Sequence, residues 1–192
     1  MKLLILNGPR DSRTAYNPLY RGTYRSHPSH CDEVSDDDEI NRLFFWFLEE
    51  GGQLGVVRDL ARAQRFAELW NARLKDSERF GVVEVADAEP GQASCGGTFM
   101  GFDLSSGYNN SLLAEGLRQS MGTQRLPEPF RELWDLTSRH YAPQLNATGL
   151  FQTFEVATMC LRSMTELQDL SPNLFEGEDL RHFQVVRLQL AP

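Results

Sequence analysis

The sequence predicts an α+β fold in which about four or five helices pack with a small, mostly antiparallel sheet. Two observations lead to this class. Short apolar or β-branched runs lie near both ends and in the middle of the chain, at residues 2–6, 80–85 and 183–190. Longer segments with helical spacing of apolar residues lie between them, and their order does not follow the strand-helix-strand alternation of a parallel sheet.

The N-terminal part combines a predicted strand with a long irregular segment. Residues 2–6 are all apolar except Lys2 and are followed by an Asn-Gly-Pro turn signal. Residues 8–34 lack helical spacing and contain three prolines. Irregular segments of this length are often functional in compact domains. We expect 1–192 to form a single domain that carries this Arg/Tyr-rich loop at 8–34.

Two helices are predicted next. The first begins at an acidic cluster after Ser35, has the periodic apolar residues Ile40, Leu43, Phe44, Phe47 and Leu48, and ends at Gly51-Gly52. The second covers about residues 59–75, with an apolar stripe from Leu60 to Leu74.

The remaining elements alternate less regularly. Phe80–Val85 and Gly97–Asp103 are predicted to form an antiparallel pair, and the glycines at 96–101 indicate close strand packing rather than a dinucleotide-binding loop. Helices are expected over 110–118, 127–141 and 153–167, and residues 183–190 are expected to form the closing strand.

Composition excludes several classes of protein. The chain has 192 residues, 19 Lys+Arg against 27 Asp+Glu, a net charge of −8 and 41% hydrophobic residues. It is too apolar to be disordered throughout, and its negative charge argues against a nucleic-acid coat and suits a basic partner. We find no signal peptide or membrane span, and three widely spaced cysteines form no Cys-x-x-Cys pair. We therefore expect a cytoplasmic protein without a membrane partner.

The charge is unevenly distributed. Residues 10–31 contain four arginines and one aspartate, whereas the next eight residues contain six acids. These six acids form the acidic patch, our candidate surface for a basic partner: Asp32, Glu33, Asp36, Asp37, Asp38 and Glu39. Alternatively, the acids only cap the helix that follows.

The loop before the acidic patch contains candidate anion-binding residues. Guanidinium groups form bidentate contacts with phosphate or carboxylate, and aromatic rings stack on bases. The candidates here are Arg13, Tyr20, Arg21 and Arg25. Alternatively, these arginines pair with the nearby acids and fix the loop to the fold.

The same loop contains residue types that bind metals. His27, His30 and Cys31 lie close together and precede an aspartate. No second ligand cluster with suitable spacing follows, so we interpret them as part of a polar loop and predict no metal site.

Two short segments resemble arginine-type ADP-ribosyltransferases. Leu19-Tyr20-Arg21-Gly22-Thr23 resembles the aromatic-Arg-Gly motif of that family, and Glu176-Gly177-Glu178 resembles its catalytic Glu-x-Glu. The resemblance implies NAD as cofactor, Arg21 holding its phosphate, Glu178 stabilising the oxocarbenium ion and Glu176 positioning the acceptor. The Ser-Thr-Ser strand motif of the family is absent.

A second resemblance covers residues 70–113. A Val-Glu-Val strand followed by an apolar-Gly-aromatic-Asp strand is similar to small bacterial proteins that include immunity proteins of polymorphic toxin systems. This resemblance implies stoichiometric binding of a toxin, with no catalytic residue and no cofactor. We therefore expect a non-enzymatic bacterial binding protein, and the alternative is an ADP-ribosyltransferase-like enzyme that uses NAD.

Overall fold

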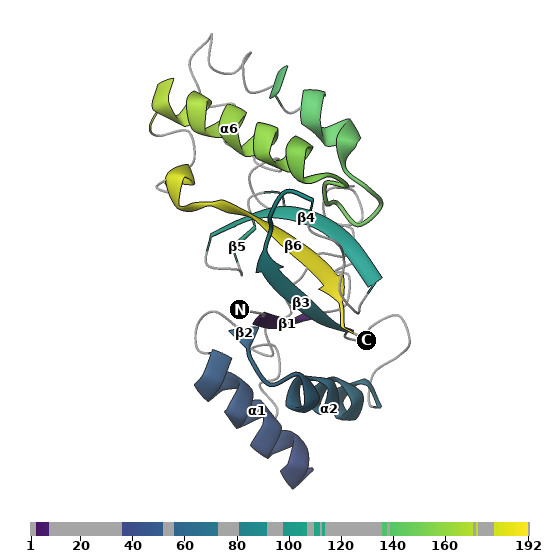
Figure 1. Cartoon of the computed structure of the whole chain (residues 1–192). Helices are drawn as coiled ribbons and strands as arrows, with labels where there is room; N and C mark the ends of the chain where they lie inside the picture. Colours follow the sequence, from purple (N-terminus) through teal and green to yellow (C-terminus); the bar gives the residue numbers. More distant parts are fainter. Residues whose placement is uncertain are drawn as a thin grey trace.

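The computed structural model describes residues 3–7, 36–51, 56–72, 81–91, 98–106, 110–111, 113, 136–137, 139–170, 172 and 179–191. In chain order the named elements are β1 (Leu3–Asn7), α1 (Asp38–Gly51), β2 (Val56–Val57), α2 (Leu60–Asn71), β3 (Gly81–Asp87), β4 (Thr98–Ser106), β5 (Asn110–Ser111), η6 (Ala142–Gln144), α6 (Phe154–Leu170), η7 (Leu180–His182) and β6 (Gln184–Leu190) (Figure 1). The elements η6 and η7 are single turns of 3-10 helix.

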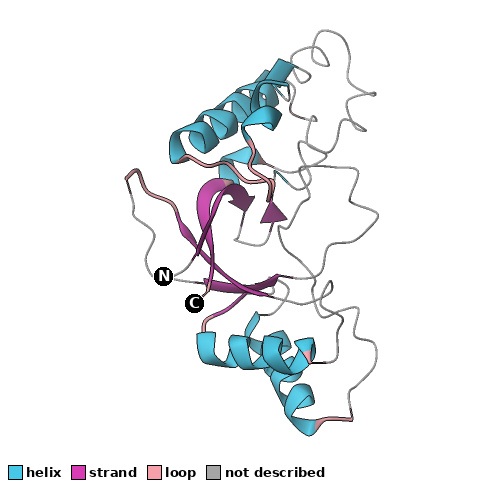
Figure 2. Ribbon diagram, turned by 90° about the vertical axis from the view of Figure 1, so that its right-hand side faces the viewer, coloured by secondary structure: helices cyan, strands magenta, loops and turns pink. Residues whose placement is uncertain are grey.

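The described strands form one sheet in the order β2-β1-β3-β6-β4-β5, and every neighbouring pair is antiparallel. Helices α1 and α2 lie at the β1/β2 end of this order, and α6 lies at the opposite end, beside β4 and β6 (Figure 1). Figure 2 shows the strands between these two groups of helices. The predicted α+β class with an antiparallel sheet is therefore confirmed.

The predicted pairing of residues 80–85 with 97–103 is wrong, because β6 lies between β3 and β4. Strand β6 pairs with β3 along one edge and with β4 along the other. The connection over residues 88–97 is longer than a typical hairpin loop of about 2–5 residues, so it allows a third strand to enter. The predicted closing strand is thus a strand, but a central one, and its four consecutive buried residues fit coverage on both faces.

Helices α1 and α2 bury their apolar stripes against the β1/β2 end of the sheet. Ile40 and Phe47 of α1 join Ala63, Phe66 and Ala67 of α2 in one buried cluster. The rings of Phe47 and Phe66 stack with centroids 5.9 Å apart. Both helices form where the periodicity predicts them, and α1 ends at the first of the two predicted glycines.

Helix α6 covers the other end of the sheet. Ala157, Cys160, Met164 and Leu167 are buried, and the helix forms close to the expected limits of 153–167. They belong to a second cluster that includes residues of β3, β4 and β6. The two clusters flank one continuous sheet, and the single-domain organisation of 1–192 stays a prediction.

The segment before α6 is fixed to a bulge in β4. The register of β4 against β6 shifts between Phe99 and Gly101, and the Asn146 side-chain amide donates to the Met100 carbonyl at 2.7 Å. Gly101 has a φ of +146°, and a Cβ at this position would lie 2.5 Å from the Leu150 Cβ. Close packing therefore requires a glycine here, as the sequence indicated for this part of the glycine-rich run.

Two further expectations have mixed outcomes. Residues 110 and 111 form the short strand β5 instead of starting a helix, because they pair with the end of β4. Of the helix expected over 127–141, residues 136–137 and 139–141 are described and are helical.

Among the described residues, no helix has both the length and the apolar character needed to span a membrane.

Candidate functional site on helices α1 and α2

The acidic patch is described only from residue 36 onwards, at the start of α1. The Asp37 carboxylate accepts hydrogen bonds from the backbone N–H groups of Glu39 (2.9 Å) and Ile40 (3.3 Å). Asp37 is therefore the N-cap of α1, and this part of the patch does have the capping role that the sequence left open. The side chains of Asp36 and Asp38 are exposed on either side of the cap.

Glu39, the last acid of the patch, forms an ion pair with α2. Arg65 donates from Nε to Oε1 at 2.9 Å and from Nη2 to Oε2 at 3.0 Å, while both side chains are about half exposed. The hydrogen bonds from Arg65 lower the pKa of the Glu39 carboxyl, and those to Glu39 raise the pKa of the guanidinium. Glu39 thus bridges the two helices.

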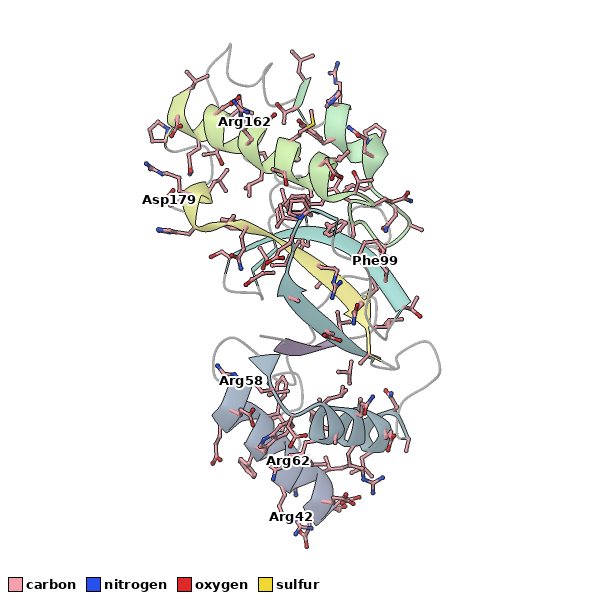
Figure 3. All side chains as sticks on the ribbon, in the orientation of Figure 1. Arg42, Arg58, Arg62, Phe99, Arg162 and Asp179 are labelled. Atoms are coloured by element: carbon pink, nitrogen blue, oxygen red, sulfur yellow. The ribbon has the colours of Figure 1, made fainter. Side chains whose placement is uncertain are left out.

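An open groove of about 440 Å³ lies between α1 and α2. The residues that line it come from both helices: Glu39, Arg42, Leu43, Trp46 and Arg62. Figure 3 labels Arg42 on α1 and Arg62 on α2, at the end of the molecule away from α6. We call this the α1–α2 groove.

Two contacts fix the indole of Trp46 in the groove. Its Nε1 donates to one oxygen of Glu50 at 2.5 Å, and the other oxygen of Glu50 accepts from the backbone N–H of Arg58 at 3.1 Å. The guanidinium of Arg62 lies over the indole ring, 5.6 Å from its centroid. These contacts order the apolar part of the groove.

The outer face of α1 carries Asp38, Phe45 and Glu49, which are all exposed and lie at helical spacing, and Arg42 lies where this face meets the α1–α2 groove. Phe45 is 54% exposed, and its ring meets that of Phe44 edge to face at 5.9 Å. Residues 36–51 contain six acids and one arginine. This face therefore presents an aromatic ring on a strongly acidic helix.

The centre of the sheet holds a set of buried polar side chains that sequence reasoning missed. Gln189 of β6 donates from Nε2 to Oε2 of Glu84 on β3 at 2.7 Å, and the two residues are cross-strand partners. Arg187 lies two residues along β6 and is also buried. Charged residues inside apolar strands, such as Glu84 between two valines, were the signal for this set. Here Glu84 and Gln189 bond each other, which indicates a structural role.

Most residues of the sequence-based site hypotheses lie outside the described part of the chain. They are Arg13, Tyr20, Arg21, Arg25, His27, His30, Cys31, Asp32, Glu33, Glu176 and Glu178. The distance between Arg21 and Glu178, on which the NAD hypothesis depends, is therefore not defined. Within the described residues, His, Cys, Asp and Glu side chains form no group of three that could hold a metal ion.

No family model, curated protein or solved structure matches this chain. The side chains on the surface of α1 and α2 are therefore the basis for a functional proposal.

Proposed function

We propose that this chain is a non-enzymatic binding protein that neutralises a basic protein, such as a toxin, by stoichiometric contact through the outer face of α1. The observation that carries the proposal is Phe45, which is 54% exposed within a segment, residues 36–51, that contains six acids and one arginine. An exposed aromatic ring supplies an anchor, and the surrounding charge supplies long-range attraction. The proposal assigns no catalytic residue and no cofactor to this surface.

The acids of α1 divide between internal and external roles. Asp37 caps the helix and Glu39 binds Arg65, so their carboxylates already have internal partners. Asp36, Asp38 and Glu49 are exposed and are the acids that we assign to the partner. Charge of this kind mainly raises the association rate, whereas burial of an aromatic ring mainly lengthens the lifetime of the complex.

The resemblance of residues 70–113 to bacterial immunity proteins supports the same role, and in that setting the complex forms in the cytoplasm. The proposed contact surface lies on α1, which precedes residues 70–113 in sequence. The resemblance and the contact surface therefore concern different parts of the chain. No catalytic step is needed, because occupying the toxin's own surface is sufficient to block it.

The test starts from gene order, because the immunity hypothesis places a toxin gene next to this one. The product of the adjacent gene is purified together with the chain at low salt, and affinity is then measured by calorimetry. We expect a 1:1 complex and a loss of affinity of about tenfold or more for Phe45→Ala. Met159→Ala trims a side chain of similar exposure, 56%, on α6 and is expected to leave affinity unchanged. Absence of a complex, or equal affinity for Phe45→Ala and the unmodified chain, would overturn the proposal.

A further inference from the structure

The α1–α2 groove has a positive excess of charge, although α1, which supplies most of its described lining, lies in an acidic segment. Among the described residues that line the groove, Glu39 is the single acid, and both of its carboxylate oxygens accept hydrogen bonds from Arg65. Arg42 and Arg62 supply two guanidinium groups to the same groove. The groove therefore carries an excess of positive charge, although residues 36–51 are acidic overall.

Both guanidinium groups keep hydrogen-bonding capacity. Arg42 donates from Nε to the backbone carbonyl of Asp38 at 3.1 Å, and Arg62 has its Nε 3.4 Å from the carboxylate of Asp59. A guanidinium group has five N–H donors, so donors remain on each side chain after these contacts. Each guanidinium group presents the planar fork of N–H donors that recognises a carboxylate.

The apolar part of the groove is held in a fixed position by contacts within the protein. Leu43 and Trp46 line it, and the indole is held by Glu50 on one side and by Arg62 over its ring. A surface that is already ordered loses less conformational entropy on binding. Its volume of about 440 Å³ falls within the range of known ligand sites, about 300–1,000 Å³.

We infer that the α1–α2 groove binds an acidic peptide segment, with a carboxylate held between Arg42 and Arg62 and a neighbouring apolar side chain against Leu43 and Trp46. One feature favours a carboxylate over a nucleotide: Arg62 already lies over the indole ring of Trp46, on which a base would stack. The inference deepens the proposed function and rests on it in one respect, since the segment belongs to the protein partner.

The two charge patterns on the helix pair then fix the orientation of the partner. Its basic surface faces the outer face of α1, and one acidic segment enters the groove. Opposite patterns placed side by side disfavour a rotated complex, because rotation brings like charges together.

The test uses two short peptides and calorimetry. Acetyl-Leu-Glu-Leu-amide is compared with acetyl-Leu-Gln-Leu-amide, which has the same shape without the charge, and adenosine monophosphate serves as the nucleotide. We expect the acidic peptide to bind about tenfold or more tightly than the neutral one. We expect Arg42→Gln/Arg62→Gln to remove this preference while circular dichroism shows an unchanged fold. Arg162→Gln on α6 is the matched control, because Arg162 is an exposed arginine in an ion pair with Glu166.

Each other outcome overturns the inference. Equal binding of the two peptides, tighter binding of adenosine monophosphate, or an unchanged preference in Arg42→Gln/Arg62→Gln would each exclude a carboxylate-binding groove. These failures are distinguishable from failure of the proposed function, because Phe45→Ala acts on the protein partner and leaves the peptide preference unchanged.

Discussion

Arg65 of α2 donates to both carboxylate oxygens of Glu39 on α1, at 2.9 and 3.0 Å. The pair joins two helices across 26 residues of sequence, and it occupies an acid that sequence analysis assigned to the partner. Beside it, Arg42 and Arg62 line the α1–α2 groove. The ion pair therefore removes Glu39 from the acids that the proposal assigns to a partner.

The first prediction concerns the pH dependence of stability. The pKa of Glu39 is lowered from its ordinary value of 4.5, mainly by the hydrogen bonds from Arg65. A carboxyl whose pKa is lower in the folded chain stabilises the fold above its unfolded pKa, and this contribution is lost as the pH falls below about 4.5. In Glu39→Gln we expect a smaller decrease of the melting temperature over this range than in the unmodified chain. The control is a double-mutant cycle at neutral pH that compares Glu39→Gln, Arg65→Gln and the double variant. If their changes in the free energy of unfolding are strictly additive, the ion pair does not stabilise the fold.

The second prediction concerns the bulge in β4. Gly101→Ala adds a Cβ that would lie 2.5 Å from the Leu150 Cβ and 2.8 Å from the Phe151 carbonyl oxygen, at a φ of +146°. We expect the free energy of unfolding in urea to fall by about 2 kcal/mol or more. Gly91→Ala is the matched control, since Gly91 has a φ of +70° with no atom within 4 Å of an added Cβ. Its cost is expected to be about 1 kcal/mol, and equal costs at the two sites would show that the close approach at Gly101 does not matter.

The third prediction concerns the thiol of Cys160. Burial in the core cluster under α6 raises its pKa to about 12. Only the thiolate reacts readily, so we expect no labelling by a thiol reagent in the folded chain at neutral pH and full labelling in denaturant. The measurement uses Cys31→Ser/Cys95→Ser, in which Cys160 is the remaining cysteine. Rapid labelling of the folded protein would place the thiol at an accessible position and contradict the packing of α6.

The fourth prediction separates the binding proposal from the alternative with NAD. A non-enzymatic binding protein is expected to release no nicotinamide from NAD, which chromatography detects directly. Nicotinamide release that is lost in Glu176→Gln/Glu178→Gln and in Arg21→Ala would favour the ADP-ribosyltransferase-like enzyme instead. Normal melting of these variants is the necessary control.

Local sequence signals predicted α1, α2 and α6 well. The apolar residues of α1 repeat at helical spacing, and both α1 and α6 form close to the predicted limits. The acids were also expected to cap this helix, and Asp37 does so, because it lies directly before the helix and its carboxylate reaches the first N–H groups. These features depend on residues a few positions apart, which is why periodicity and capping rules find them.

Strand order and the groove could not be predicted in the same way. The insertion of β6 between β3 and β4 joins segments about a hundred residues apart, as the contact of Gln189 with Glu84 illustrates. The groove exists only because α1 and α2 pack at one particular angle, which brings Arg42 and Arg62 to one site. Neither the pairing nor the angle is encoded in short-range spacing.

The central claim is that the exposed acids of α1 attract a basic protein partner, and the most direct measurement is the association rate at increasing salt. The partner is the product of the adjacent gene, and the variants are Asp36→Asn/Asp38→Asn and, as the control on α6, Glu155→Gln. We predict a rate that falls steeply with salt in the unmodified chain and in the control, and a rate about tenfold lower at low salt in Asp36→Asn/Asp38→Asn. An association rate that is independent of salt, or unchanged in Asp36→Asn/Asp38→Asn, would contradict the claim.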